Sequence, residues 1–185
     1  MKIYFRYLSY FIPWIFAIAI LSGCSFNHDY VWEEYPISPE RVVIAETDKD
    51  STNTGSIEIK SGDNDTKKIL LGHINMNAHY WYGSLQLLAD SIVTQLSGEL
   101  IKRNYTLGAN SKKTVEVKVD SYSLEPGMWR YAYNIDFEIT LGNGIVRKFH
   151  VKNSSPASPV RGINGAVALA VIEIMNSRDF IDYIN

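Results

Sequence analysis

The stretch from Met128 to Leu141 restricts the fold more than any other part of the chain, because large apolar side chains alternate along it with mainly polar ones. An alternation with a period of two places the two sets on opposite faces of a β-strand. We therefore predict a long, half-buried strand. The residues that face the core are Trp129, Tyr131, Tyr133, Ile135, Phe137, Ile139 and Leu141.

Two further strands are predicted beside it. Thr114–Leu124 begins with apolar residues at odd positions and ends with them at even positions, which indicates a bulge or bend near Ser121. Glu125-Pro126-Gly127 is a turn sequence, and Gly142-Asn143-Gly144 suits a tight hairpin before a returning strand at Ile145–Val151. The three strands form an antiparallel meander.

The clearest helix is predicted at Ser84–Arg103. Leucine and isoleucine recur there every three or four residues, and Ser84 is a suitable N-cap. Lys102 and Arg103 complement the negative end of the helix dipole. One apolar stripe of this helix should therefore face a core.

A closing helix is predicted at Asn164–Asn176, after a loop at Asn153–Ile163 that contains two prolines and a glycine. Arg178–Asn185 should add one more helical turn. Apolar residues surround almost the whole closing helix, so it is either well buried or partly an interface, and burial against the sheet is the favoured alternative.

The two sides of the closing helix are assigned from its helical period. Val167, Val171, Ile174 and Arg178 follow one side, whereas Leu169, Ile172 and Met175 turn toward another. Because the first side ends in a charged residue, we assign Leu169, Ile172 and Met175 to the core. Val167 and Val171 then become a possible partner surface.

The N-terminal half has shorter signals. Strands are predicted at Arg41–Glu46, Ser56–Lys60 and Lys68–Ile74, separated by polar, turn-forming stretches. Together with the meander and the helices, they predict an α/β fold of the α+β kind in one domain at residues 40–185. Its sheet is mostly antiparallel, with a C-terminal three-stranded meander and two main helices packed on one face.

The first 24 residues have the layout of a secretory signal. A short basic segment containing Lys2 and Arg6 precedes an apolar run from Leu8 to Leu21. The run ends in Leu21-Ser22-Gly23-Cys24, which resembles the lipobox of bacterial lipoproteins. This resemblance implies removal of a signal peptide at residues 1–23 and diacylglyceryl attachment to Cys24, the only cysteine in the chain.

Two other interpretations of the N-terminus remain open, namely a permanent membrane anchor and a cleaved signal without lipid. The apolar run is shorter than the roughly 20 residues that span a bilayer as a helix, which disfavours the permanent anchor. Residues 24–39 lack a helical or strand period and are interpreted as a tether whose aromatic residues rest on headgroups or pack onto the domain. In lipoproteins of this kind, an aspartate after the cysteine favours the inner membrane, so Ser25 implies an outer-membrane address facing the periplasm.

The net charge of the chain disfavours a nucleic-acid partner. Without residues 1–23 the chain keeps 16 basic and 20 acidic residues, a net charge of about −4, and no basic cluster is visible in its sequence. Nucleic-acid binding needs such a cluster, so no nucleic-acid partner is predicted. The expected partners are the membrane, through the lipid on Cys24, and an envelope protein, glycan or lipid. The oligomeric state is not predicted.

The order of elements in the mature chain is similar to that of YajG-like envelope lipoproteins and, more distantly, of auxiliary lipoproteins of envelope transport systems. It consists of a lipobox, N-terminal strands, a helix, a meander and a final alanine-rich helix. This resemblance implies a small α/β sandwich that acts in the envelope without catalysis. The polar region at Asp48–Lys68 is longer than that plan needs.

The sequence contains no recognisable motif of catalysis or metal binding. The chain has no nucleophile elbow, no phosphate-binding glycine loop and no zinc-protease motif. Asp136 and Glu138 share the polar side of one strand and are interpreted as a solvated face. His73 and His79 have no known ligand spacing. We therefore predict a non-catalytic binding or assembly module with no cofactor and no metal; the alternative is an enzyme whose site is scattered along the chain.

Overall fold

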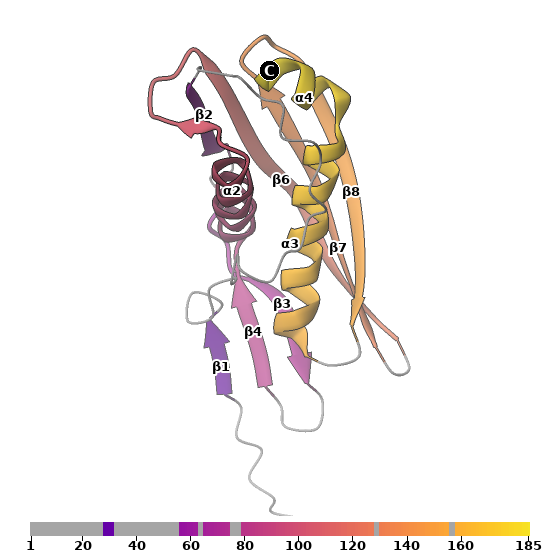
Figure 1. Ribbon diagram of the computed structural model, residues 1–185. Coiled ribbons are helices and arrows are strands. Elements are labelled where there is room, and N and C mark those ends of the chain that lie inside the picture. Colours follow the sequence, from indigo (N-terminus) through magenta and orange to yellow (C-terminus); the bar gives the residue numbers. More distant parts are fainter. Residues whose placement is uncertain (1–27, 32–55, 63–64, 75–78, 128–129, 156–157) are drawn as a thin grey trace, which may run out of the picture.

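The computed structural model describes residues 28–31, 56–62, 65–74, 79–127, 130–155 and 158–185. They form an α+β fold with two β-sheets and three helices (Figure 1). The predicted fold class is thereby confirmed. The strand predicted at Arg41–Glu46 lies outside the described residues.

The larger sheet has five strands in the order β5-β2-β6-β7-β8. Its C-terminal part is the predicted antiparallel meander, whereas β2 runs parallel to both of its neighbours, β5 and β6. The strands are β2 (Ser56–Ser61), β5 (Thr106–Leu107), β6 (Lys113–Pro126), β7 (Tyr131–Leu141) and β8 (Val146–Ser155).

Strand β7 has the predicted alternation. Its odd-numbered residues from Tyr133 to Leu141 are buried, whereas Asp136, Glu138 and Thr140 are only partly covered. Asn134 is an exception, an even-numbered residue that is 5% exposed. Trp129, also predicted to face the core, lies outside the described residues. Phe137 is 1% exposed and stacks on Phe149 of β8, with ring centroids 5.0 Å apart. The inner face of this sheet is therefore the floor of the hydrophobic core.

A β-bulge in β6 explains the change of parity in its sequence. The register of β6 against β7 shifts between Val119 and Ser121, where the bend was predicted. Before the shift Val119 faces the core, and after it Tyr122 and Leu124 pack against the core instead. The extra residue lets the apolar side chains of both halves of the strand reach the same face.

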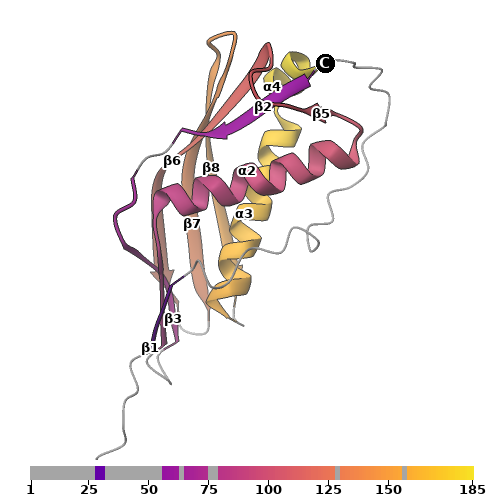
Figure 2. The same ribbon diagram turned by 90° about the vertical axis from the view of Figure 1, so that its left-hand side faces the viewer.

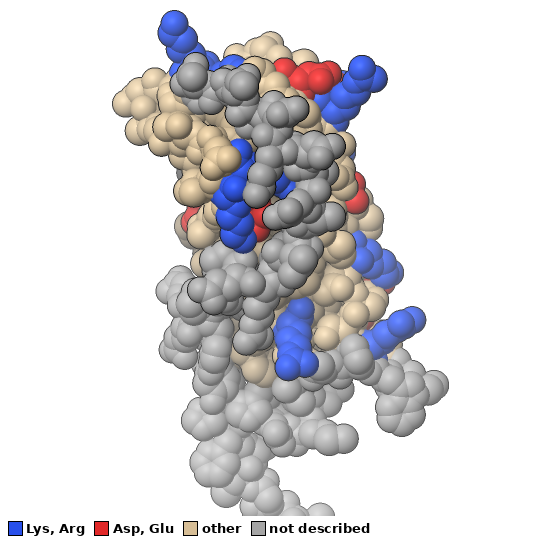
Figure 3. All heavy atoms as spheres, in the orientation of Figure 1, with Lys and Arg blue, Asp and Glu red and all other residues tan. Residues whose placement is uncertain are grey.

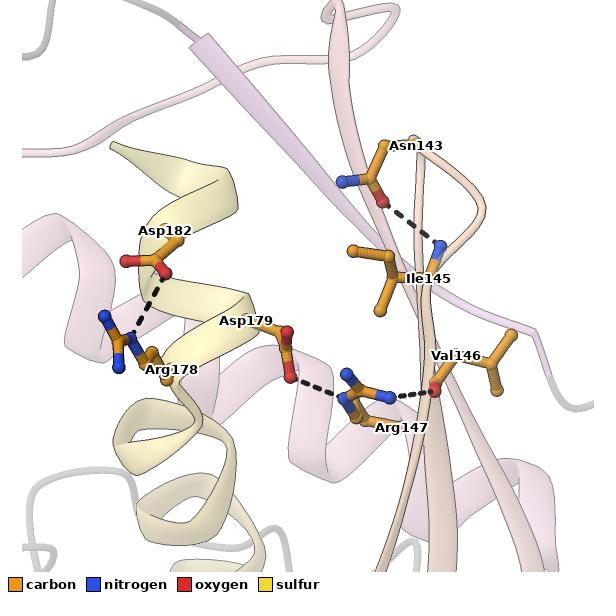
Figure 4. A network of polar contacts seen from close by, with 7 residues as sticks. All are labelled: Asn143, Ile145, Val146, Arg147, Arg178, Asp179 and Asp182. Carbon is orange, nitrogen blue, oxygen red and sulfur yellow. Dashed lines mark hydrogen bonds and ion pairs between the residues drawn. The ribbon is translucent and has the colours of Figure 1, made fainter.

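The hairpin between β7 and β8 is a tight turn. Leu141 and Ile145 pair through their backbones, the Gly144 N–H donates to the Leu141 carbonyl, and Gly144 has a φ of 88°. This geometry matches a three-residue loop with glycine in a left-handed conformation. The side chain of Asn143 accepts a hydrogen bond from the Ile145 N–H at 3.1 Å (Figure 4).

The smaller sheet has the order β1-β4-β3, with β1 (His28–Val31), β3 (Ile69–Ile74) and β4 (His79–Gly83). Strands β3 and β4 are antiparallel neighbours, and β1 pairs in parallel with β4 from His28 opposite His79 onward. Residues 28–31 belong to the segment interpreted as a tether. For these four residues the interpretation is wrong, because their backbone hydrogen bonds join them to the domain.

Helix α2 (Leu85–Lys102) confirms the clearest helix prediction. The Ser84 side chain accepts a hydrogen bond from the Leu87 N–H, as an N-cap should. A stripe of fully buried side chains faces the core, formed by Leu88, Ala89, Ile92, Leu96 and Leu100.

Helix α3 (Pro159–Asn176) begins five residues earlier than the sequence pattern predicted, and β8 continues to Ser155. The predicted loop at Asn153–Ile163 is therefore mostly strand and helix. Ser158 caps the helix by accepting from the Arg161 N–H, and Pro159 occupies the first turn, where its missing N–H is not needed. Helices α2 and α3 lie on the same face of the five-stranded sheet (Figure 2).

The short helix α4 (Arg178–Ile184) fastens the C-terminus to the sheet. Asp179 accepts from Arg147 of β8 at 2.5 Å, and Arg178 and Asp182 form an ion pair along the helix (Figure 4). The Tyr183 hydroxyl accepts from the Thr114 N–H. The additional helical turn predicted after Arg178 is confirmed.

The assignment of the two sides of α3 was wrong except for Met175, which is buried as predicted. Val167 and Val171 are both 0% exposed within the core, whereas Leu169 and Ile172 are only partly buried. The prediction treated Arg178 as the charged end of the valine side. Because α3 ends at Asn176 and Arg178 belongs to α4, the charge of Arg178 does not indicate whether Val167 and Val171 face the core or the solvent.

Glycines line the seam between α3 and the strands beneath it. A Cβ atom on Gly162 would overlap the ring of Tyr133, and one on Gly165 would overlap the side chain of Asn153. The Asn153 amide instead donates to the Gly162 carbonyl at 2.7 Å. The backbone of α3 thus lies so close to β7 and β8 that only glycine fits at these two positions.

Candidate functional site

The face of the five-stranded sheet that carries no helix is polar, and we call it the outer face. Cross-strand register lines up its side chains in rows, one of which, Lys118, Glu138 and Lys148, alternates in charge. Two ion pairs on it join neighbouring strands, Lys60 to Glu116 at 3.0 Å and Lys148 to Glu138 at 3.5 Å. A third, Lys152 to Glu125 at 2.6 Å, reaches across β7 from β8 to β6. This face therefore offers many hydrogen-bonding and charged groups on a rigid support.

One row of the outer face brings a serine, an aspartate and a histidine together. The Ser121 hydroxyl donates to one oxygen of Asp136 at 2.6 Å, and the other oxygen lies 2.7 Å from Nδ1 of His150. The hydrogen bond from Ser121, assisted by that of His150, lowers the pKa of Asp136 below its ordinary value. Asp136 is therefore a carboxylate at neutral pH.

The order of these three groups differs from that of a catalytic triad. A triad needs the serine hydroxyl on the imidazole, so that histidine can take its proton. Here Asp136 stands between the other two, and its charge holds the serine proton rather than removing it. The arrangement orients groups for binding but does not activate Ser121 as a nucleophile.

Asp136 and Glu138, which share the outer face as predicted, contact different partners on β8. Asp136 lies against His150, and Glu138 lies against Lys148. A pair for acid and base work needs two environments that separate the two pKa values, with one group held protonated. Asp136 is not held protonated, because its neighbours stabilise its charge.

A second polar cluster lies inside the domain, where β3 meets β6, β7 and the start of α3. The Tyr122 hydroxyl donates to the Leu71 carbonyl, and the Tyr131 hydroxyl lies 3.2 Å from Nε2 of His73. The hydroxyl of Tyr133 is buried and has no hydrogen-bond partner in the described part of the chain. Burial raises the pKa of Tyr133 to about 12 and that of Tyr122 further, so both phenols stay neutral and can act only as hydrogen-bonding groups.

The two buried tyrosines should respond in opposite ways to loss of their hydroxyls. Tyr122→Phe should lower the free energy of unfolding by about 1 to 2 kcal/mol, because it leaves the Leu71 carbonyl without its partner. Tyr133→Phe should raise it by about 1 kcal/mol, because it removes a buried hydroxyl that makes no hydrogen bond. Urea titrations of the two purified variants measure both changes. Equal losses would mean that the Tyr133 hydroxyl has a partner in solution.

The residues singled out from the sequence are spread over the molecule. Cys24 lies outside the described residues, and Val167 and Val171 are in the core. His73 belongs to the tyrosine cluster. Within the described ranges, no group of three or more histidine, cysteine or acidic residues could hold a metal ion, and no helix is long and apolar enough to cross a membrane.

Sequence reasoning missed the contact between Asp136 and His150, although a signal was present. Both residues lie seven positions from Asn143, the middle of the hairpin, so the turn places them opposite one another. The tyrosine cluster had no comparable signal, because its contact between Tyr122 and Leu71 joins segments 51 residues apart.

No protein-family model matches the chain, and no curated protein matches it significantly. The resemblances to the lipobox and to YajG-like lipoproteins therefore stay predictions.

Proposed function

We propose that this chain is a non-catalytic envelope lipoprotein, held by lipid on Cys24 in the outer membrane and facing the periplasm, where it acts as a binding or assembly module. The observation that carries the proposal is the order of a basic segment, an apolar run and Leu21-Ser22-Gly23-Cys24. Its chemistry requires cysteine, since only a thiol forms the thioether that bears diacylglycerol. Small residues at positions 22 and 23 leave the next peptide bond accessible to a signal peptidase.

The outer face of the five-stranded sheet is the surface that we assign to the partner. It is broad, carries both signs of charge and is supported by ten-residue and longer strands on a packed core. Such a face suits a polar partner, a protein or a glycan, that pairs with alternating charges and hydrogen-bonding groups. The geometry of Ser121, Asp136 and His150 favours this use over nucleophilic catalysis.

The anchor can be tested at Cys24 itself. Cys24→Ser should abolish acylation, because a hydroxyl does not form the thioether, and should leave uncleaved precursor or soluble protein. One acyl chain binds membranes only marginally, whereas two or more hold firmly, so the mature wild type should stay in the membrane pellet through a high-salt wash. Labelling cells with a clickable palmitate analogue measures the attachment. Equal label on wild type and variant would refute the proposal.

A further inference from the structure

The distance between the lipid and the folded domain is short. Three residues separate Cys24 from His28, the first residue of β1, which pairs with β4. Four steps of fully extended chain reach at most about 14 Å. An acylated Cys24 in the surface of a bilayer therefore holds the start of β1 within about 14 Å of that surface.

Several elements meet at the end of the domain where β1 starts. Strand β3 ends there beside the start of β4, with Ile74 opposite His79. A Cβ atom on Gly72 would overlap the ring of Pro159, which places the start of α3 at this end, and the contact of His73 with Tyr131 places the start of β7 there. Figures 1 and 2 show these elements at the same end of the molecule. We call it the anchor end.

Two arginines of the anchor end form no ion pair with any residue that the structure describes. Arg130 precedes β7 and Arg161 lies in the first turn of α3, both are exposed, and neither side chain makes an ion pair among the described residues. The neighbouring acid Glu125 is held by Lys152. Figure 3 shows basic side chains exposed in the lower part of the view, around the start of α3. Among the described residues of the anchor end, Arg130, Arg161 and Lys152 outnumber the acidic residues Glu125 and Asp29, on a chain whose overall charge is negative.

We propose that the anchor end docks on anionic phospholipid headgroups through Arg130 and Arg161, an inference that rests on the acylation of Cys24 proposed above. Guanidinium groups bind phosphate oxygens in a bidentate manner. A basic residue near an anionic membrane surface strengthens binding roughly fivefold. Because the lipid already confines the domain to the bilayer, this modest gain is enough to select one orientation.

The geometry of the domain also fits a membrane surface at this end. With the anchor end down, β7 and β8 rise away from the bilayer, and the outer face stays open to a partner.

The orientation can be measured by energy transfer in vesicles that contain the acylated, full-length mature protein. A fluorescent donor is attached to Ser154→Cys near the anchor end or to Asn143→Cys in the hairpin at the opposite end of β8, with an acceptor dye in the lipid. Mass spectrometry first establishes that Cys24 is acylated, so that its thiol does not react. In vesicles of phosphatidylethanolamine and phosphatidylglycerol, we expect strong transfer from position 154 and weak transfer from position 143.

Charge reversal is the decisive comparison. Arg130→Glu with Arg161→Glu should reduce the docked population relative to free orientations by roughly 25-fold or more. The difference between the two transfer efficiencies should then shrink to the smaller value that the lipid tether alone leaves in phosphatidylcholine vesicles. Lys67→Glu with Lys112→Glu changes the net charge equally at two exposed lysines away from this end and should leave the difference intact. Circular dichroism checks that both double variants are folded.

The failures of the two proposals can be told apart. If mass spectrometry finds no lipid on Cys24, the proposed anchor fails. If Cys24 is acylated but the arginine variant keeps the wild-type transfer difference, or if phosphatidylcholine vesicles give the same difference, the docking on anionic headgroups is overturned.

Discussion

Val171→Lys is expected to leave the domain unfolded, whereas Ile172→Lys is expected to leave it folded. The Val171 side chain is fully buried between α3 and the rest of the core, so a lysine there would place a charge among apolar groups without a partner. Ile172, one residue further along the helix, is only partly buried, and a long lysine side chain can carry its ammonium group into water. Far-ultraviolet circular dichroism and thermal melts of the two variants measure the difference.

Val171→Ala is the matched control, because it removes apolar volume from the same position without adding charge. It should cost about 1 to 3 kcal/mol and leave a cooperative transition. If Val171→Lys melted like the wild type, Val171 would not be in the core and the packing of α3 would differ from that in the structure. If both lysine variants were unfolded, both sides of the helix would belong to the core.

Phe137→Ala should lower the free energy of unfolding by about 3 to 5 kcal/mol, the usual range for truncation of a buried aromatic side chain. The residue is almost completely buried and also loses its stacking partner Phe149. Its neighbour Glu138 points to the outer face, where it pairs with the exposed Lys148. Glu138→Ala should therefore change stability by no more than about 0.5 kcal/mol.

Denaturant titrations of the two β7 variants compare the faces of one strand under the same conditions. Phe137→Leu serves as a control that keeps an apolar side chain and should lose less than Phe137→Ala. Comparable losses for Phe137→Ala and Glu138→Ala would contradict the register of β7 against β6 and β8.

The parts of the fold that sequence predicted well are those whose signals are local. Strand β7 carries a period of two over eleven residues, α2 has its own serine cap, and the glycines of the hairpin match the turn that they form. The bulge near Ser121 was visible because the apolar positions change parity within one strand. Each of these signals depends only on residues close together in the chain.

The errors occurred where the answer depends on distant residues. Strand β1 has four residues and no clear pattern, and only its pairing with β4, some fifty residues later, makes it a strand. Helix α3 is apolar around most of its circumference, so its period does not indicate which side meets the sheet. Ser158-Pro159 was a usable signal for the earlier helix start, since serine suits the cap and proline the first turn.

For the candidate sites, too, the features that depend on neighbouring residues were predicted and those that depend on distant residues were not. The polarity of the outer face followed from the even-numbered residues of β7, and Asp136 and Glu138 were correctly placed on it. The tyrosine cluster could not be foreseen, because it depends on the bulge, the glycine in α3 and the position of β3 together.

The glycine seam of α3 has a consequence for the uniqueness of the folded state. Sliding the helix by four residues, about one turn, would bring Ala166 to the place of Gly162 and Leu169 to the place of Gly165. Even a single methyl group at the first of these places overlaps Tyr133. An almost uniformly apolar helix could otherwise bury itself nearly as well in several registers. Glycine at positions 162 and 165 therefore allows only one alignment of the helix on the sheet.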